Sequence, residues 1–335
     1  MKKLFFAVVS LVFVLGCSND FELTDAWKDI PVVYGFLNQK DTAHYVRVEK
    51  AFLDPVTSAL TIAKIADSLY YKDATVFLER GSDNKRFQLE RVDGALEGYP
   101  RDTGIFAQNP NILYKIKQST INLKPGETCK VIIERGENLP EVTGQTVILG
   151  ALEISTPKQS ITGVHFKTGD QFSMTWIAPT EAQIFDLSAT IRIREEVIGS
   201  TEVRNRTLNW SIARNVKRNP GSTSDFVSKS VPGSSFFKFL ADNLTPDPTV
   251  NRYITSTGID FRVDGAGAEV NEYNDVLNAN SGISGAELIP VYTNMSEGFG
   301  LFPSRGFIIE KGYGPNQVTR DSLIGGQYTR NLGFK

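Results

Sequence analysis

The chain has 335 residues, of which 41% are hydrophobic, with 36 Lys and Arg against 38 Asp and Glu. Residues 1–16 hold two of the lysines and no acidic residue, so the remainder carries 34 basic and 38 acidic residues, a net charge of −4. Nucleic-acid binding requires an excess of positive charge, so we expect no nucleic-acid partner. A chain of this length buries enough apolar surface to fold without disulfides.

The first 17 residues have the pattern of a bacterial lipoprotein signal. Two lysines precede the apolar run Leu4–Gly16, and Val14–Cys17 has the form of a lipobox. A membrane-spanning helix needs about 20 apolar residues, so this run is too short to be a permanent span. We expect cleavage after residue 16 and lipid attachment at Cys17. The alternative is an ordinary secretory signal that happens to end near a cysteine.

The polar, acidic segment 17–27 is predicted to be a tether between the lipid and a folded body. No later stretch approaches membrane-spanning length, so we expect the membrane contact to be made by acyl chains. The only other cysteine, Cys129, shares a strand face with Val131 and Ile133. We interpret Cys129 as a buried packing residue, with a reactive thiol as the alternative.

Residues 28–150 are predicted to form a first β-sandwich, because apolar residues recur at every second position in several short runs. The composition of 81–84 indicates a hairpin turn, and Thr57–Tyr70 is the one helical insertion expected here. The segment Leu123–Cys129 resembles the L-x-P-G-x-x-Y corner of fibronectin type III and related immunoglobulin-like domains, with Cys129 in the tyrosine position. The resemblance implies that strand F follows it and that Val142–Leu149 is strand G.

Residues 151–335 are predicted to form a second, fibronectin type III-like β domain. The segment Phe172–Pro179 and the alternating strand after it resemble strands B and C of that fold. We expect a loop over Asn215–Gly233, a short helix near 235–243, and a last strand at Thr329–Phe334. The helix is expected to cover a sheet edge or an end of the sandwich, with a partner-binding helix as the alternative. The predicted fold class is therefore all-β, with two tandem immunoglobulin-like sandwiches.

Groups that carry catalysis are scarce in this sequence. There are two histidines, His44 and His165, which we place at surface strand positions in different domains, and no nucleophile elbow or nucleotide loop is present. Asp260–Gly265 begins like a calcium loop, but Arg262 occupies a ligand position, so a hairpin turn is the better interpretation. We expect no cofactor, no metal and no enzymatic activity, although a glycosidase-like carboxylate pair stays open.

One glycine-rich segment near the C-terminus carries several bulky side chains beside an arginine. We interpret it as a candidate binding patch, because aromatic residues and arginine dominate interface energetics. The alternative is a loop that packs over the end of the sandwich, with its arginine paired with a carboxylate. The candidate residues are Tyr292, Asn294, Phe299, Phe302 and Arg305.

Several short motifs together resemble a group of Bacteroidota outer-membrane lipoproteins of uncharacterised function. The resemblance implies tandem immunoglobulin-like modules and a partner such as a TonB-dependent receptor or another outer-membrane barrel. Three D-[ST]-apolar matches, at Thr42, Ser68 and Ser322, also fit the O-glycosylation pattern of that phylum. The motifs that carry the resemblance are the lipobox, Pro31–Leu37, Ala66–Tyr71, the Leu123–Gly126 corner, Ser235–Leu240, Tyr292–Asn294, Gly300–Phe302 and Ser304–Arg305.

These observations lead to three hypotheses. The first is a lipid-anchored outer-membrane lipoprotein that binds or scaffolds beside a barrel or a transport or secretion complex. The second is an accessory of a TonB-dependent uptake system that captures glycan or peptide through Phe299, Phe302 and Arg305. The third is a hydrolase with an unrecognised carboxylate site. The sequence is compatible with either face of the outer membrane and does not determine the oligomeric state.

Overall fold

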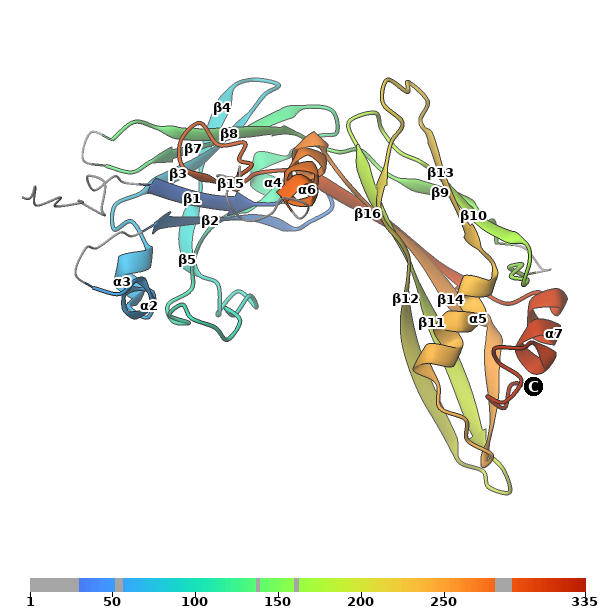
Figure 1. Ribbon diagram of the computed structural model, residues 1–335. Coiled ribbons are helices and arrows are strands. Elements are labelled where there is room, and N and C mark those ends of the chain that lie inside the picture. The colour runs from blue at the N-terminus through green and yellow to red at the C-terminus, as the bar shows by residue number, and fades with distance from the viewer. Residues whose placement is uncertain (1–29, 52–56, 137–138, 160–162, 281–290) are drawn as a thin grey trace, which may run out of the picture.

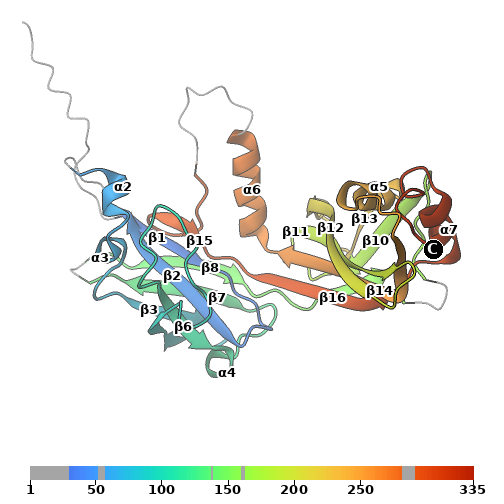
Figure 2. The ribbon, with the colours of Figure 1, turned by 90° about the horizontal axis from the view of Figure 1, so that it is seen from below.

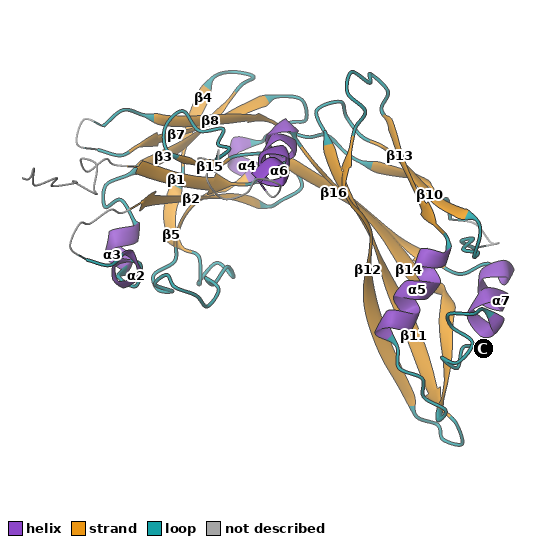
Figure 3. Ribbon diagram, viewed as in Figure 1, coloured by secondary structure: helices purple, strands orange, loops and turns teal. Residues whose placement is uncertain are grey.

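The computed structural model describes residues 30–51, 57–136, 139–159, 163–280 and 291–335. These residues are mostly β-strands, arranged as two sandwiches that meet near residue 150 (Figures 1 and 3). Cys17 and the predicted tether lie outside the described residues. The fold class expected from the sequence, two tandem immunoglobulin-like β-sandwiches, is confirmed.

The first sandwich has the strand order of an immunoglobulin-like domain. One sheet has the order β15-β1-β2-β6-β5, and the other has the order β4-β3-β7-β8. Strands β1 to β8 occupy the places of A, B, C, C′, D, E, F and G, because A, B, E and D share one sheet and C, F and G the other. Their bounds are β1 Ile30–Gly35, β2 Ala43–Ala51, β3 Thr75–Arg80, β4 Lys85–Gln88, β5 Glu90–Asp93, β6 Ile112–Lys117, β7 Thr128–Glu134 and β8 Val142–Val147.

The predicted corner before strand F is present, with a different internal bond. Leu123 is buried, and Cys129 lies fully buried in β7 beside the strand positions of Val131 and Ile133. Where a tyrosine hydroxyl would hold the loop, the Glu127 carboxylate accepts a hydrogen bond from the backbone N–H of Lys124. Burial raises the pKa of the Cys129 thiol to about 12, so this cysteine is a packing residue as predicted.

Three short helices belong to the first sandwich. The predicted helical insertion is two single turns, α2 (Ala59–Ile62) and α3 (Ala66–Leu69), and α4 (Gln118–Ile121) follows β6. The predicted hairpin turn joins β3 to β4, and Asn84 there adopts a left-handed φ of 53°. Asparagine tolerates that backbone region better than most residues, which explains its place in the turn.

The second sandwich follows the same plan, with no strand D among its described residues. Its sheets have the orders β13-β10-β9 and β12-β11-β14-β16, which correspond to E-B-A and C′-C-F-G. In the described residues, helices α5, α6 and α7 accompany these sheets. The bounds are β9 Glu153–Thr156, β10 Gln171–Ile177, β11 Ile184–Val197, β12 Val203–Lys217, β13 Phe226–Pro232, β14 Val250–Ala266, β16 Arg305–Tyr313, α5 Ser234–Asn243, α6 Ala268–Asn280 and α7 Gln317–Gly325.

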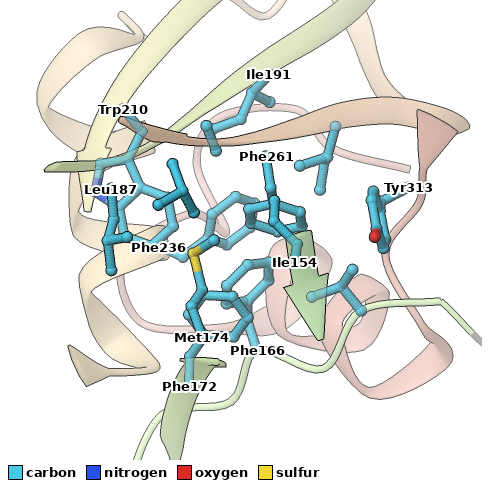
Figure 4. Packing of buried hydrophobic residues seen from close by; sticks show 14 of the residues in the cluster. Ile154, Phe166, Phe172, Met174, Leu187, Ile191, Trp210, Phe236, Phe261 and Tyr313 are labelled. Carbon is cyan, nitrogen blue, oxygen red and sulfur yellow. The ribbon is translucent and has the colours of Figure 1, made fainter. Parts of the chain in front are cut away.

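Aromatic side chains fill the core of the second sandwich (Figure 4). The predicted helix, α5, inserts Phe236 between the sheets, where its ring stacks on Phe166 at a centroid distance of 4.2 Å. Phe236 also lies 5.7 Å from Trp210 of β12, centroid to centroid. The helix therefore closes the core, as the covering interpretation predicted.

Three local predictions for this half are wrong. Part of the expected loop is β13, whose mostly exposed polar side chains hide the alternation that marks a strand. Asp260–Gly265 is no hairpin turn but lies within β14, where Arg192 binds Asp260 through two hydrogen bonds of 2.6 and 2.7 Å. Thr329–Phe334 is a series of turns with one bridge, not a strand, because only Phe334 pairs with another residue.

Between α6 and β16, residues 291–304 lie against the first sandwich, and we call them the strap. Its strand β15 (Phe299–Leu301) pairs in parallel with β1, and its Met295 bridges Gly144 of β8 in the opposite sheet (Figure 2). The strap thus connects the two sheets along one side of the first sandwich, although the sequence assigned it to the second domain.

Candidate functional site

The strap explains where the predicted patch residues lie. Phe302 is fully buried in the core of the first sandwich, so it lines no exposed patch. Asn294 spans the strap's own loop, because its Oδ1 accepts from the N–H of Phe302 at 2.9 Å and its Nδ2 donates to the Phe302 carbonyl at 3.0 Å. Tyr292 donates its hydroxyl to Glu272 of α6 at 2.7 Å, and burial together with this carboxylate raises the pKa of Tyr292.

Phe299 and Arg305 remain exposed, but they do not share one surface. Phe299 pairs with Val32 near the start of β1, whereas Arg305 donates its backbone N–H to Leu37 beyond the end of β1. Val32 and Leu37 are 37 − 32 = 5 steps apart along the extended chain, which corresponds to about 17 Å. The predicted single patch is therefore wrong, because Phe302 lies in the core while Phe299 and Arg305 lie near opposite ends of β1.

Arg305 belongs instead to a pocket between the two sandwiches, which we call the junction pocket. Its volume is about 310 Å³, within the range of small-ligand sites. Strands β11, β14 and β16 form its floor, α6 forms one wall, and Phe36 of the first sandwich forms another. The lining residues are Phe36, Ile184, Phe185, Asp186, Asn215, Arg262, Asp264, Gly265, Ala266, Val270, Asn274, Arg305, Gly306 and Phe307.

Strand register places two aspartates opposite each other on the floor of the junction pocket. Asp186 of β11 pairs with Asp264 of β14, which places two like charges opposite each other and is unfavourable by itself. Arg262 offsets this repulsion by donating two hydrogen bonds to Asp264, at 2.5 and 2.6 Å. The bond to Asp264 raises the pKa of Arg262. Its guanidinium lies 4.5 Å from the centre of the Phe307 ring.

An amide pair extends the polar part of the floor towards α6. Asn215 has a left-handed φ of 52° and donates its backbone N–H to the Asp186 carboxylate at 2.8 Å. Its side-chain oxygen accepts a hydrogen bond from the Asn274 amide of α6 at 3.4 Å. Asparagine tolerates this backbone region better than most residues, and Asn215 lies where the pairing of β11 with β12 shifts register.

Arg305 is the least engaged charge in the junction pocket. Its side chain is 56% exposed, and its nearest carboxylate oxygen, on Asp41, is 3.8 Å away. The guanidinium lies 5.9 Å from the centre of the Phe36 ring, which is itself exposed. Arginine presents five N–H donors, so most of them here are free to meet a ligand. The predicted carboxylate partner of Arg305 is thus present, at a long distance.

Chemically, the junction pocket offers donors, acceptors and aromatic faces without a net charge. Two arginines balance two aspartates, and no histidine, cysteine, serine or lysine lines the pocket. Asp186 and Asp264, the two acids, are both engaged in the bonds described above. The arrangement suits recognition of a polar ligand better than proton transfer or nucleophilic attack.

The two histidines lie away from this pocket. His44, predicted at the surface, is instead buried and bonds Gln118 through Nε2 at 2.7 Å, and burial lowers its pKa. His165 is in an exposed loop, where its ring nitrogens contact Asp170 at 3.0 Å and Asn316 at 3.2 Å. In the described part of the chain, no group of three or more His, Cys, Asp or Glu side chains is placed to hold a metal ion.

The three predicted glycosylation positions differ in access. Thr42 is exposed in the turn before β2. The hydroxyl of Ser68 donates to backbone carbonyls at 2.6 and 2.7 Å, and that of Ser322 donates to the Val318 carbonyl of α7 at 2.8 Å. Thr42 is therefore the most exposed of the three predicted positions.

Sequence reasoning found one lining residue of the junction pocket, Arg305. Arg262 and Asp264 were noticed only because they resembled a calcium loop, and Asn215 was assigned to a loop. The signal that marks the floor is the row of charged residues on the outer face of β11 and β14. Its meaning depends on α6 and Phe36, which come from distant parts of the sequence.

Comparisons with known proteins find distant structural likenesses. A scan against protein-family models found no match, and a search of curated proteins found none. Among solved structures, the FN1–FN3 domains of chicken CNTN1 match at 10% identity and a TM-score of 0.18, over 82% of this chain and 66% of that one. The C-terminal globular domain of an oligosaccharyltransferase from Pyrococcus abyssi matches at 8% identity and a TM-score of 0.19, over 92% of this chain and 56% of that one.

The strand order described above, rather than these matches, defines the class of protein. It is an all-β chain of two immunoglobulin-like sandwiches with a pocket at their junction. None of the helices in the described ranges is long and apolar enough to cross a membrane.

Proposed function

We propose that this protein is a non-enzymatic lipoprotein, anchored through Cys17 to the outer membrane, that binds a partner beside an outer-membrane barrel or a transport or secretion complex. The observation that carries the binding role is the junction pocket, which residues of both sandwiches line. The anchor rests on the lipobox at Val14–Cys17. The expected partner is an outer-membrane protein. The proposal covers a body on either face of the outer membrane.

The anchor and the partner are tested separately. Mass spectrometry of the N-terminal peptide should find Cys17 carrying acyl chains, and fractionation should recover the protein with outer membranes. Crosslinking followed by gentle solubilisation should recover an outer-membrane protein with it. An unmodified Cys17 thiol contradicts the anchor, whereas recovery of the protein alone at native abundance contradicts the partner. Turnover of any glycan or peptide in a substrate panel contradicts the non-enzymatic role.

A second candidate function is capture of a glycan or peptide for a TonB-dependent uptake system. The observation that favours it is the loosely paired Arg305 beside the Phe36 ring, since aromatic faces and free donors recognise polar ligands. Binding to glycan and peptide arrays should weaken roughly ten- to a hundredfold in Arg305→Ala, the effect of losing a charged hydrogen bond. Arg204→Ala is the matched control, because Arg204 is similarly exposed but lies on β12 outside the pocket.

A further inference from the structure

A cluster of apolar side chains projects from one end of the first sandwich. Leu60 is 59% exposed and Ile65 is 53% exposed, in and after α2. Ile105 and Phe106, in the loop between β5 and β6, are 53% and 41% exposed. We call these four residues the platform. Groups of exposed apolar residues in a folded protein mark contacts with proteins or membranes.

The two parts of the platform are fastened to each other. The N–H of Ala107 donates to the carbonyl of Ala63 at 2.7 Å, which joins the β5–β6 loop to the turn after α2. Arg101 lies beneath, with only 13% of its side chain exposed, and pairs with Glu49 of β2. Its guanidinium also lies 5.1 Å from the centre of the Phe106 ring. The platform is therefore held to the sheet by a nearly buried ion pair.

Strand register places the platform at the end of the sheet where the tether enters. Ile30, the first residue of β1, pairs with Ala51, the last residue of β2, and α2 follows β2 in the chain. Strand β6 runs antiparallel to β2, so the loop before Ile112 lies at this same end. Figure 1 shows α2 and α3 at the end of the first sandwich away from the second one, and Figure 2 agrees.

The length of chain before Ile30 limits how far this end can be from the bilayer. Twelve residues lie between Cys17 and Ile30, which makes 30 − 17 = 13 steps along the chain, and an extended chain spans at most about 3.3–3.6 Å per step, so the reach is about 45 Å. A lipid on Cys17 therefore keeps the platform end near the membrane. The charged neighbours of the platform include both signs, Lys64, Asp67 and Asp102, so apolar insertion rather than attraction to anionic headgroups fits the surface.

We infer that the platform rests on the bilayer surface, with Leu60, Ile65, Ile105 and Phe106 inserted into the boundary between headgroups and acyl chains. The inference rests on the proposed lipid anchor and adds an orientation to it. Aliphatic and aromatic side chains on a short projecting loop enter this boundary without any spanning segment. The second sandwich and its junction pocket then lie on the side of the first sandwich away from the bilayer.

Fluorescence of a single label tests the contact in the full, lipidated protein. Ile105→Cys is labelled with a polarity-sensitive fluorophore, and the buried Cys129 stays unlabelled. Ile198→Cys, 57% exposed in the β11–β12 hairpin turn of the second sandwich, is the matched control. Both proteins are inserted into vesicles of phosphatidylethanolamine and phosphatidylglycerol, with and without brominated acyl chains.

The label at 105 should shift to the blue on vesicles and lose roughly half its intensity or more to brominated lipid, because the boundary is only about 5–10 Å deep. The label at 198 should change little. Adding Phe106→Asp to the labelled protein should remove most of the quenching. Equal emission at the two positions on vesicles overturns the inference, while the lipid anchor stands if the protein still floats with the vesicles. A blue-shifted label at 105 in whole outer membranes but not in vesicles overturns the inference in favour of a protein partner.

Discussion

Replacing Phe302 with alanine should destabilise the first sandwich, although the residue lies 302 − 149 = 153 positions beyond that domain's last predicted strand. Its side chain is fully buried, and its ring packs on the bare backbone of Gly35, where a Cβ atom would come within 3.0 Å of it. Truncating a buried phenylalanine costs about 3–5 kcal/mol, and the strap cannot fill the space without giving up its pairing with β1. We expect a loss of that size in the free energy of unfolding of the first sandwich.

Native-state hydrogen exchange followed by mass spectrometry measures this loss for each sandwich separately. Amides of β1, β7 and β8 that exchange by opening of the first sandwich should do so roughly 100-fold faster or more in Phe302→Ala, since each 1.4 kcal/mol is a factor of ten. The control is Phe299→Ala, on the same short strand but 42% exposed, which should change stability by about 0.5 kcal/mol or less. A cost below about 1 kcal/mol for Phe302→Ala, or one equal to that of the control, would refute the role of the strap.

Three further predictions concern other positions. Gly300→Ala should release β15 from β1, because φ at Gly300 is 143° and a Cβ atom there would lie 1.8 Å from a backbone oxygen. The measurement is the midpoint of urea unfolding, which should fall. The control is Gly104→Ala, which should be neutral because Gly104 has open space around it. Arg252→Met should lower the free energy of unfolding, measured with urea, by about 3–5 kcal/mol, because it leaves the buried Glu195 without its partner at 2.8 Å. Adding Glu195→Leu should recover part of that loss, and no recovery would contradict the reasoning. The raised pKa of Cys129 predicts that its contribution to the free energy of unfolding is complete below pH 9 and is lost as the pH rises towards 12. The free energy of unfolding should therefore fall less steeply with rising pH in Cys129→Val than in the unchanged protein. Equal slopes of the two curves would contradict this.

Local patterns sufficed for much of the fold. Alternating apolar residues predicted the strands of both cores, and the Leu123–Gly126 corner identified strand F and its neighbour. The helix α5 was predictable because Phe236 and Leu240 recur at helical spacing after a serine. These features depend on neighbours within a few residues, which a single sequence displays directly.

The parts that were missed depend on partners far away in the chain. Strand β13 has few buried side chains, and α6 has no pronounced apolar face, so neither shows a periodic signal. Phe302 resembled a binding residue because glycines surround it, yet those glycines allow the strap to approach β1 closely. The junction pocket could not be predicted, because Phe36 and Arg305 meet only after both sandwiches have formed.

The strap also has a consequence for the order in which the protein can mature after synthesis. The hydroxyl of Ser304 reaches the carbonyl of Leu37 across 267 positions of the sequence. Strands β1 to β8 are synthesised long before the strap, which borders the outer edges of β1 and β8. The first sandwich therefore stays incomplete until nearly the whole polypeptide has been made.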